Sequence, residues 1–196
     1  MRQLSYAVVF GTLWGTIEMT AGGLLHALHV PFSGILLATI GAAILACQRA
    51  LCPVRGITLT TGGLAAGIKV FSMGGVYLNP LLAVLMEALL AEVVFCLLGT
   101  SFLAAWLAGF LMGLWSFVQG LLTLVLLYGM HWIEASASAL SRQAPPWPLS
   151  PVALLLLVVV LLMSLSASGG LLGLLSARRF QGAVPVSACE LRKENA

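Results

Sequence analysis

Residues 80–98 read PLLAVLMEALLAEVVFCLL, an apolar run in which Glu87 and Glu92 are the only charged residues. An α-helix needs about 20 apolar residues to cross the hydrocarbon core of a bilayer, so this run predicts a transmembrane helix. A charge in that core is costly unless it has a partner or faces water. The two glutamates therefore indicate either a solute or ion site or a buried structural pair.

The composition of the whole chain agrees with a membrane location. Of its 196 residues, 61% are hydrophobic and only 8% are charged, and the mean hydropathy is +1.09. A soluble domain carries about 25% charged residues. We therefore predict an all-α integral membrane bundle in the lipid bilayer. No basic segment with interleaved aromatic residues points to nucleic acid.

Five further apolar segments accompany residues 80–98, and turn-forming residues separate them. Together they predict about six transmembrane helices in residues 1–178, followed by a cytoplasmic tail in residues 179–196. We expect the first segment to be retained, because it is too long for a signal peptide and lacks a clear cleavage site. The six segments cover residues 4–25, 31–51, 56–77, 80–98, 101–130 and 151–176.

The lysines and arginines determine the predicted orientation. If both termini are cytoplasmic, only Arg142 among the cationic residues of loops and tails lies on the outer side. This asymmetry satisfies the positive-inside rule and requires an even number of spans. The cationic residues on the cytoplasmic side are then Arg2, Arg49, Arg55, Arg178, Arg179, Arg192 and Lys193.

Three charged residues of different segments are predicted to lie at one depth. At 1.5 Å per residue, Glu18, Lys69 and Glu87 each lie about 10–12 Å below the outer surface. Glu92 is deeper and about 140° around the helix from Glu87, so these two glutamates cannot share a face. A cluster of the first three that opens outward is geometrically possible. Its role stays open between a structural ion pair, a solute pocket and a proton relay.

Polar residues near the outer ends of two segments extend this candidate site. His26 and His29 follow the first segment, and Asn79 follows the third. We predict that all three contact a solute. Two histidines three residues apart can bind one metal, but no third ligand is evident, so no metal site is predicted. The four cysteines show no metal-binding or disulfide spacing, and no cofactor is predicted.

Catalytic motifs are missing from the sequence, and we predict that the chain is not an enzyme. It contains no H-E-x-x-H, no G-x-S-x-G and no ATP-binding G-x-x-x-x-G-K-[ST] sequence. Any energy for transport must then come from an ion gradient or from a partner subunit.

Small residues form stripes along several predicted helices. Ala7, Gly11 and Gly15 follow one face of the first helix, and Glu18 lies on the same face. Small residues let helix backbones approach closely inside a bilayer. Such a stripe serves either packing within the bundle or docking of another membrane subunit. Two other stripes comprise Ala105, Gly109, Gly113, Ser116 and Gly120, and Ser166, Gly169, Gly170, Gly173 and Ser176.

With six predicted spans and the stripe of Ala7, Gly11 and Gly15, the chain resembles the S components of energy-coupling factor transporters. These are bacterial membrane subunits that bind vitamins, their precursors or transition-metal ions. The resemblance implies a multi-pass protein of the bacterial cytoplasmic membrane, whose stripe docks a T component that couples to two ATPases. The chain lacks a histidine-containing segment before its first span, which favours an organic solute over a metal. The implied solute contacts are Glu18, Lys69, Glu87 and Asn79.

Two other functions stay open. The first is a secondary transporter that moves protons through Glu18 and Glu87. The second is a membrane assembly or scaffold subunit in which the ion pairs are purely structural. The acidic positions of the first half of the chain do not recur in the second half. The sequence therefore lacks the internal symmetry that secondary transporters often have.

Overall fold

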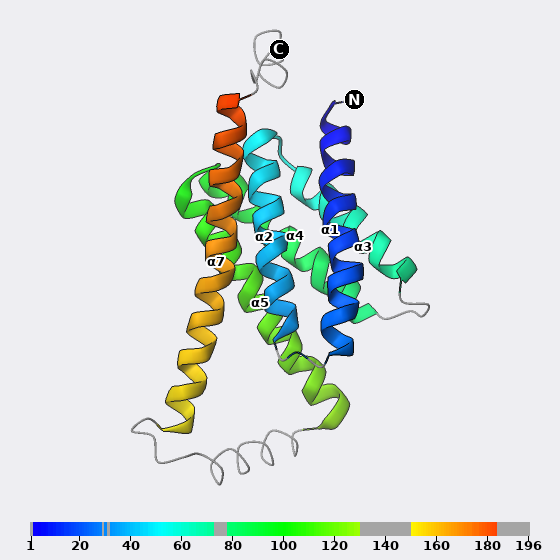
Figure 1. Cartoon of the computed structure of the whole chain (residues 1–196), viewed down its shortest axis with the longest axis vertical. Coiled ribbons are helices and arrows are strands. Elements are labelled where there is room, and N and C mark those ends of the chain that lie inside the picture. Colours follow the sequence, from blue (N-terminus) through cyan, green and yellow to red (C-terminus); the bar gives the residue numbers. More distant parts are fainter. Residues whose placement is uncertain (1, 29, 31, 73–77, 130–149, 184–196) are drawn as a thin grey trace.

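The computed structural model describes residues 2–28, 30, 32–72, 78–129 and 150–183, and these residues form a bundle of α-helices (Figure 1). The predicted all-α fold is confirmed. Five of the helices are long and apolar enough to cross a membrane, whereas α3 is shorter. The chain is thus a multi-pass membrane protein. The helices are α1 (Arg2–Ala27), α2 (Ser33–Leu51), α3 (Ile57–Ser72), α4 (Leu78–Leu98), α5 (Phe102–Tyr128) and α7 (Pro151–Ala183).

The helix ends follow local sequence chemistry. The hydroxyl of Ser101 accepts a hydrogen bond from the Ala104 N–H at 3.1 Å and so caps the start of α5. Gly99 and Gly129 follow the ends of α4 and α5 with φ of 66° and 74°. Glycine adopts this left-handed conformation without the steric penalty of a side chain, and it commonly ends helices.

The last helix is longer than we predicted. α7 continues to Ala183 and contains 33 residues, so its length of about 50 Å exceeds the roughly 30 Å of a bilayer core. Its final turns contact other helices. The Arg178 guanidinium lies 4.2 Å from the centre of the Phe102 ring, and Gln181 Nε2 donates to the Ala50 carbonyl at 2.8 Å. The predicted boundary at residue 178 therefore falls within a helix.

Four arginines lie at one end of the bundle. The start of α1, the connection between α2 and α3, and the end of α7 lie at the same end of the molecule (Figure 1). We call this the arginine-rich end, defined by Arg49, Arg55, Arg178 and Arg179. The positive-inside rule predicts that it faces the cytoplasm.

Helix α2 is the centre of the bundle and contacts every other described helix. Figure 1 shows it between α7 and α1. Glycines of α7 allow its close contact with α2. A Cβ atom on Gly169 would overlap the carbonyl oxygen of Thr39, and one on Gly173 would overlap that of Ala43. The stripe of small residues predicted near the inner end of the last helix therefore packs within the chain.

The contact between α5 and α7 uses the other predicted stripe. A Cβ atom on Gly109 would overlap the carbonyl oxygen of Ser166, and one on Gly170 would overlap that of Ala105. Ser166 Oγ also donates to the Gly109 carbonyl at 2.7 Å. Close backbone packing and interhelical hydrogen bonds are the main sources of helix association in lipid.

Gly173→Ala should destabilise the fold, because the new methyl group would meet the backbone of α2, which cannot rotate away. Over-packing of this kind costs about 1–3 kcal/mol of unfolding free energy. The measurement is unfolding in mixed detergent micelles, followed by circular dichroism. Gly67→Ala is the matched control, because a Cβ atom there has no neighbour within 4 Å. Equal unfolding midpoints for the two variants would contradict the close α2–α7 contact.

Candidate functional site

An ion pair joins α1 and α3 inside the bundle. Lys69 Nζ lies 2.5 Å from Glu18 Oε2. The side chains are 12% and 3% exposed, respectively, so the pair is largely removed from the surface. The sequence makes a cluster that includes these two residues geometrically possible, and the structure places them in direct contact. Whether they bind a solute stays a prediction.

The close approach of α1 and α3 creates this pair. A Cβ atom on Gly15 would lie 3.0 Å from the Ile68 Cβ, and one on Gly11 would lie 2.9 Å from the Leu64 Cβ. Glu18 follows Gly15 by about one turn of α1, and Lys69 directly follows Ile68. The glycines thus bring the two charged residues within hydrogen-bonding distance.

The same contacts bear on the predicted docking stripe. Gly11 and Gly15 face α3, and Ala7 is buried in a cluster with Cys52 and Ile57. The stripe of Ala7, Gly11 and Gly15 is therefore covered by the chain itself. In the structure this face packs against other residues of the same chain, which is the alternative to docking of another subunit.

Glu87 of α4 is the third charged residue of the cluster. It is 4% exposed, and it lies close enough to interact electrostatically with Glu18 and Lys69. A Cβ atom on Gly62 would overlap that of Ala88, so α3 and α4 touch beside Glu87. Its Oε2 atom has no hydrogen-bond partner among the described residues. We call Glu18, Lys69 and Glu87 the acidic cluster, because it contains one ammonium group and two carboxyl groups.

Trp14 lies one helical turn before Glu18 on α1 and is completely buried. Two glycines make room for its ring. A Cβ atom on Gly41 of α2 would lie 2.9 Å from the indole Nε1, and one on Gly62 of α3 would lie 3.6 Å from Cζ3. The indole therefore fills the space between α1, α2 and α3 beside the acidic cluster.

The remaining predicted solute contacts are placed only in part. His26 belongs to the last turns of α1, and Asn79 belongs to the first turn of α4. The positions of their side chains, like the whole of His29, lie outside the described part of the chain. Their roles as solute contacts stay predictions.

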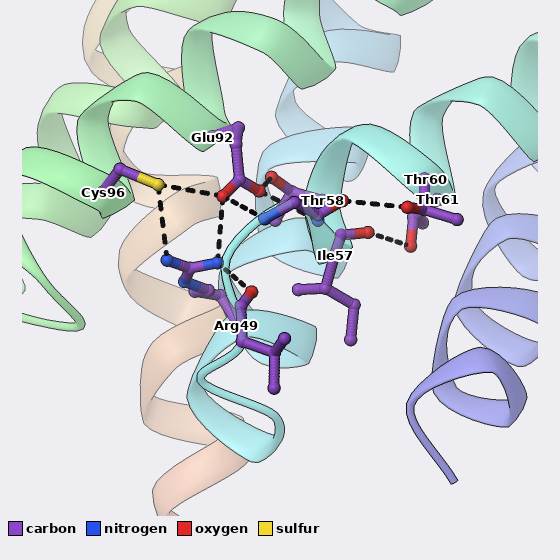
Figure 2. A network of polar contacts seen from close by, with 9 residues as sticks. Arg49, Ile57, Thr58, Thr60, Thr61, Glu92 and Cys96 are labelled. Atoms are coloured by element: carbon purple, nitrogen blue, oxygen red, sulfur yellow. Dashed lines mark hydrogen bonds and ion pairs between the residues drawn. The ribbon is translucent and has the colours of Figure 1, made fainter. Parts of the chain in front are cut away.

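Glu92 belongs to a separate network near the arginine-rich end (Figure 2). Its Oε1 accepts hydrogen bonds from the Gly56 N–H at 2.6 Å, from Arg49 Nη1 at 3.1 Å and from Cys96 Sγ at 3.0 Å. Its Oε2 accepts from the Thr58 N–H at 3.1 Å and from the Thr58 hydroxyl. Glu92 thus satisfies backbone donors at the start of α3, a favourable place for negative charge.

Sequence reasoning missed the partner of Glu92. The positive-inside rule places Arg49 on the cytoplasmic side and names no partner for it, whereas in the structure it is 4% exposed in the last turn of α2. Its guanidinium pairs with Glu92 and also donates to the Val54 carbonyl. The pairing could have been predicted by comparing depths in the bilayer. Arg49 and Glu92 both lie shortly before the ends of their helices, at the same end of the bundle.

No metal-binding group of three or more histidines, cysteines or acidic residues occurs in the described part of the chain. No family model matches the chain, and no curated protein and no solved structure matches it. The assignment of function therefore depends on the residues of this chain and their geometry.

The two glutamates of α4 should respond differently to the same substitution. Glu92→Gln removes a charge that Arg49 and four further donor groups match, so we expect a loss of about 3–5 kcal/mol in unfolding free energy. Glu87→Gln removes a buried charge without a matched set of donors, so we expect a loss below about 1 kcal/mol, or a gain. Chemical unfolding in detergent micelles measures both values. Equal losses would show that Glu87 is as firmly held as Glu92.

Gly15→Leu separates internal packing from docking. A leucine would collide with Ile68 and with the α3 backbone at Ala65, and we expect it to lower the unfolding free energy of the isolated chain by about 1–3 kcal/mol. Thermal unfolding of the purified chain tests this. An unchanged midpoint would restore the docking role, because a surface stripe is not needed for the fold of the isolated chain.

Proposed function

We propose that the chain is the membrane-embedded, solute-binding subunit of an uptake transporter, of the kind represented by the S components of energy-coupling factor transporters. Its solute is a vitamin, a vitamin precursor or a similar small molecule. The observation that carries the proposal is the acidic cluster, in which a buried carboxylate oxygen of Glu87 has no hydrogen-bond partner among the described residues. Buried polar groups in folded proteins are nearly always hydrogen-bonded.

A purely structural role explains the acidic cluster poorly. The network around Glu92 matches its carboxylate with donors from α2, α3 and the connection between them. At Glu87 a comparable set is missing from the described residues. A role of Glu87 in ligand binding would explain why it differs from Glu92. Ionisable residues inside transmembrane segments commonly belong to substrate sites.

The position of the acidic cluster also supports uptake. Glu18 lies in the second half of α1 and Lys69 in the last turn of α3, so both are distant from the arginine-rich end. If that end faces the cytoplasm, the cluster lies in the outer half of a bacterial cytoplasmic membrane. A solute arriving from outside would meet it first.

Transport would require partners, because the sequence contains no ATP-binding motif. In an energy-coupling factor complex, a T component and two ATPases would supply the energy. Since α3 covers Ala7, Gly11 and Gly15, the T component would dock on a different face of this chain.

A second candidate is proton-coupled transport. The partnerless oxygen of Glu87 favours it, because a proton can neutralise a buried carboxylate as well as a solute can. Liposomes containing the purified chain would then acidify in response to an imposed proton gradient. Glu87→Gln would abolish that flux.

A thermal-shift screen of the purified chain tests the proposed function. A ligand that binds only the folded state raises its melting temperature by mass action, and we expect a shift of several degrees with one class of small solute. The panel comprises vitamins, their precursors, nucleobases, amino acids and divalent metals. A flat screen on a well-folded sample would overturn the proposal and favour the proton-coupled or scaffold function.

If Lys69 anchors the solute, Lys69→Met should abolish the response to the compound found in the screen; if the lysine only neutralises Glu18, the substitution should chiefly lower the melting temperature. Arg55→Met is the control, because Arg55 is an exposed cation at the arginine-rich end. The single substitution leaves Glu18 unpaired and costs stability, so Glu18→Gln/Lys69→Met is tested as well, since it preserves the local charge. Unchanged binding by a folded double variant would exclude Glu18 and Lys69 as solute contacts.

A further inference from the structure

We infer that the solute carries a positively charged nitrogen, which binds the carboxylate of Glu87. This inference rests on the proposed function and names the class of its substrate. It follows from the charges of the acidic cluster, the hydrogen bonds of its members and the contrast with Glu92.

Within the acidic cluster, the one ammonium group is already engaged. Lys69 Nζ is 2.5 Å from Glu18 Oε2, so it is poorly placed to be the main anchor of an anion. When all three groups are ionised, one ammonium and two carboxylates give the cluster a formal charge of +1 − 2 = −1. An anionic solute would increase this negative charge in an interior where charges interact strongly.

The other described cations lie elsewhere. Arg55, Arg178 and Arg179 belong to the arginine-rich end, and Arg49 is bound to Glu92. Within the part of the chain that the structure describes, no second cation therefore reaches Glu87. A cation supplied by the solute would complete the cluster, because buried charges in proteins are normally paired.

Glu92 shows how this chain holds a structural carboxylate. On the same helix, it accepts hydrogen bonds from two backbone amides, a hydroxyl, a thiol and a guanidinium. Glu87 is equally buried, yet its Oε2 lacks a donor among the described residues. A protonated nitrogen supplies both the missing donor and the missing positive charge in a single group.

Two sets of compounds of similar size test the charge preference. The first set contains tyramine, tyrosol and 4-hydroxyphenylacetate, and the second contains histamine, imidazole-ethanol and imidazole-acetate. Each set presents an amine, an alcohol and a carboxylate on one ring. The melting temperature of the full chain in nanodiscs is measured at about pH 8.5, where imidazole rings are neutral and the alkyl amines are still charged. Each compound is added at up to about 10 mM, where even weak ligands produce a shift. We expect the amines to raise it and the other compounds to leave it unchanged.

Variants then locate the effect. Glu87→Gln should weaken amine binding by about thirtyfold or more, as expected when a buried charge pair loses one member. Glu87→Asp, which keeps the carboxylate, should recover part of the affinity. Glu190→Gln removes the same charge near the C-terminus and should have no effect. Because Glu87 has few partners, its variants should stay folded.

Three outcomes would overturn the inference. These are a larger shift with the carboxylates than with the amines, amine binding that survives Glu87→Gln, and no response to either amine. Failure of the proposed function is distinct from these outcomes. A neutral or anionic compound that binds in the wider screen would keep the solute-binding function and reject the cationic class, whereas two flat screens would reject both.

Discussion

The hydrocarbon core of a membrane contains no water to solvate a charge, and the interior of this bundle is organised around that constraint. Three glutamates lie inside it, and each is treated differently. Glu92 is saturated by donors from α2 and α3, and Glu18 is paired with Lys69. Glu87 keeps an oxygen without a partner among the described residues. The difference separates the two glutamates whose charges are matched within the bundle from the one to which we assign a ligand.

Glycine packing makes these polar contacts possible. Gly11 and Gly15 let α1 approach α3, and Gly62 lets α3 approach α4. Side chains as short as glutamate can then meet across the interface. Because lipid provides no hydrophobic drive for helix association, the same close contacts also provide much of the packing energy. Substitutions at the glycines therefore act on the fold and on the acidic cluster together.

A structural ion pair accounts for Glu18 and Lys69, but not for Glu87. In the network around Glu92, the chain shows that it can satisfy a buried carboxylate completely. The incomplete cluster lies away from the arginine-rich end, and the proposed uptake function requires that a solute reach it from the outer side. This arrangement is the basis of our proposal for a solute-binding subunit that depends on partners for energy and takes a solute with a positive charge.

The sequence by itself determined the class of fold and most helix ends, because a bilayer forces every long apolar run to satisfy its own backbone hydrogen bonds as a helix. Depth counted along those helices showed that Glu18 and Lys69 could meet. Only the tertiary structure decided which faces touch. It covered Ala7, Gly11 and Gly15 with α3, and it paired Arg49 with Glu92. Helical periodicity defines the face on which a residue lies, but the neighbour of that face depends on packing between segments distant in sequence.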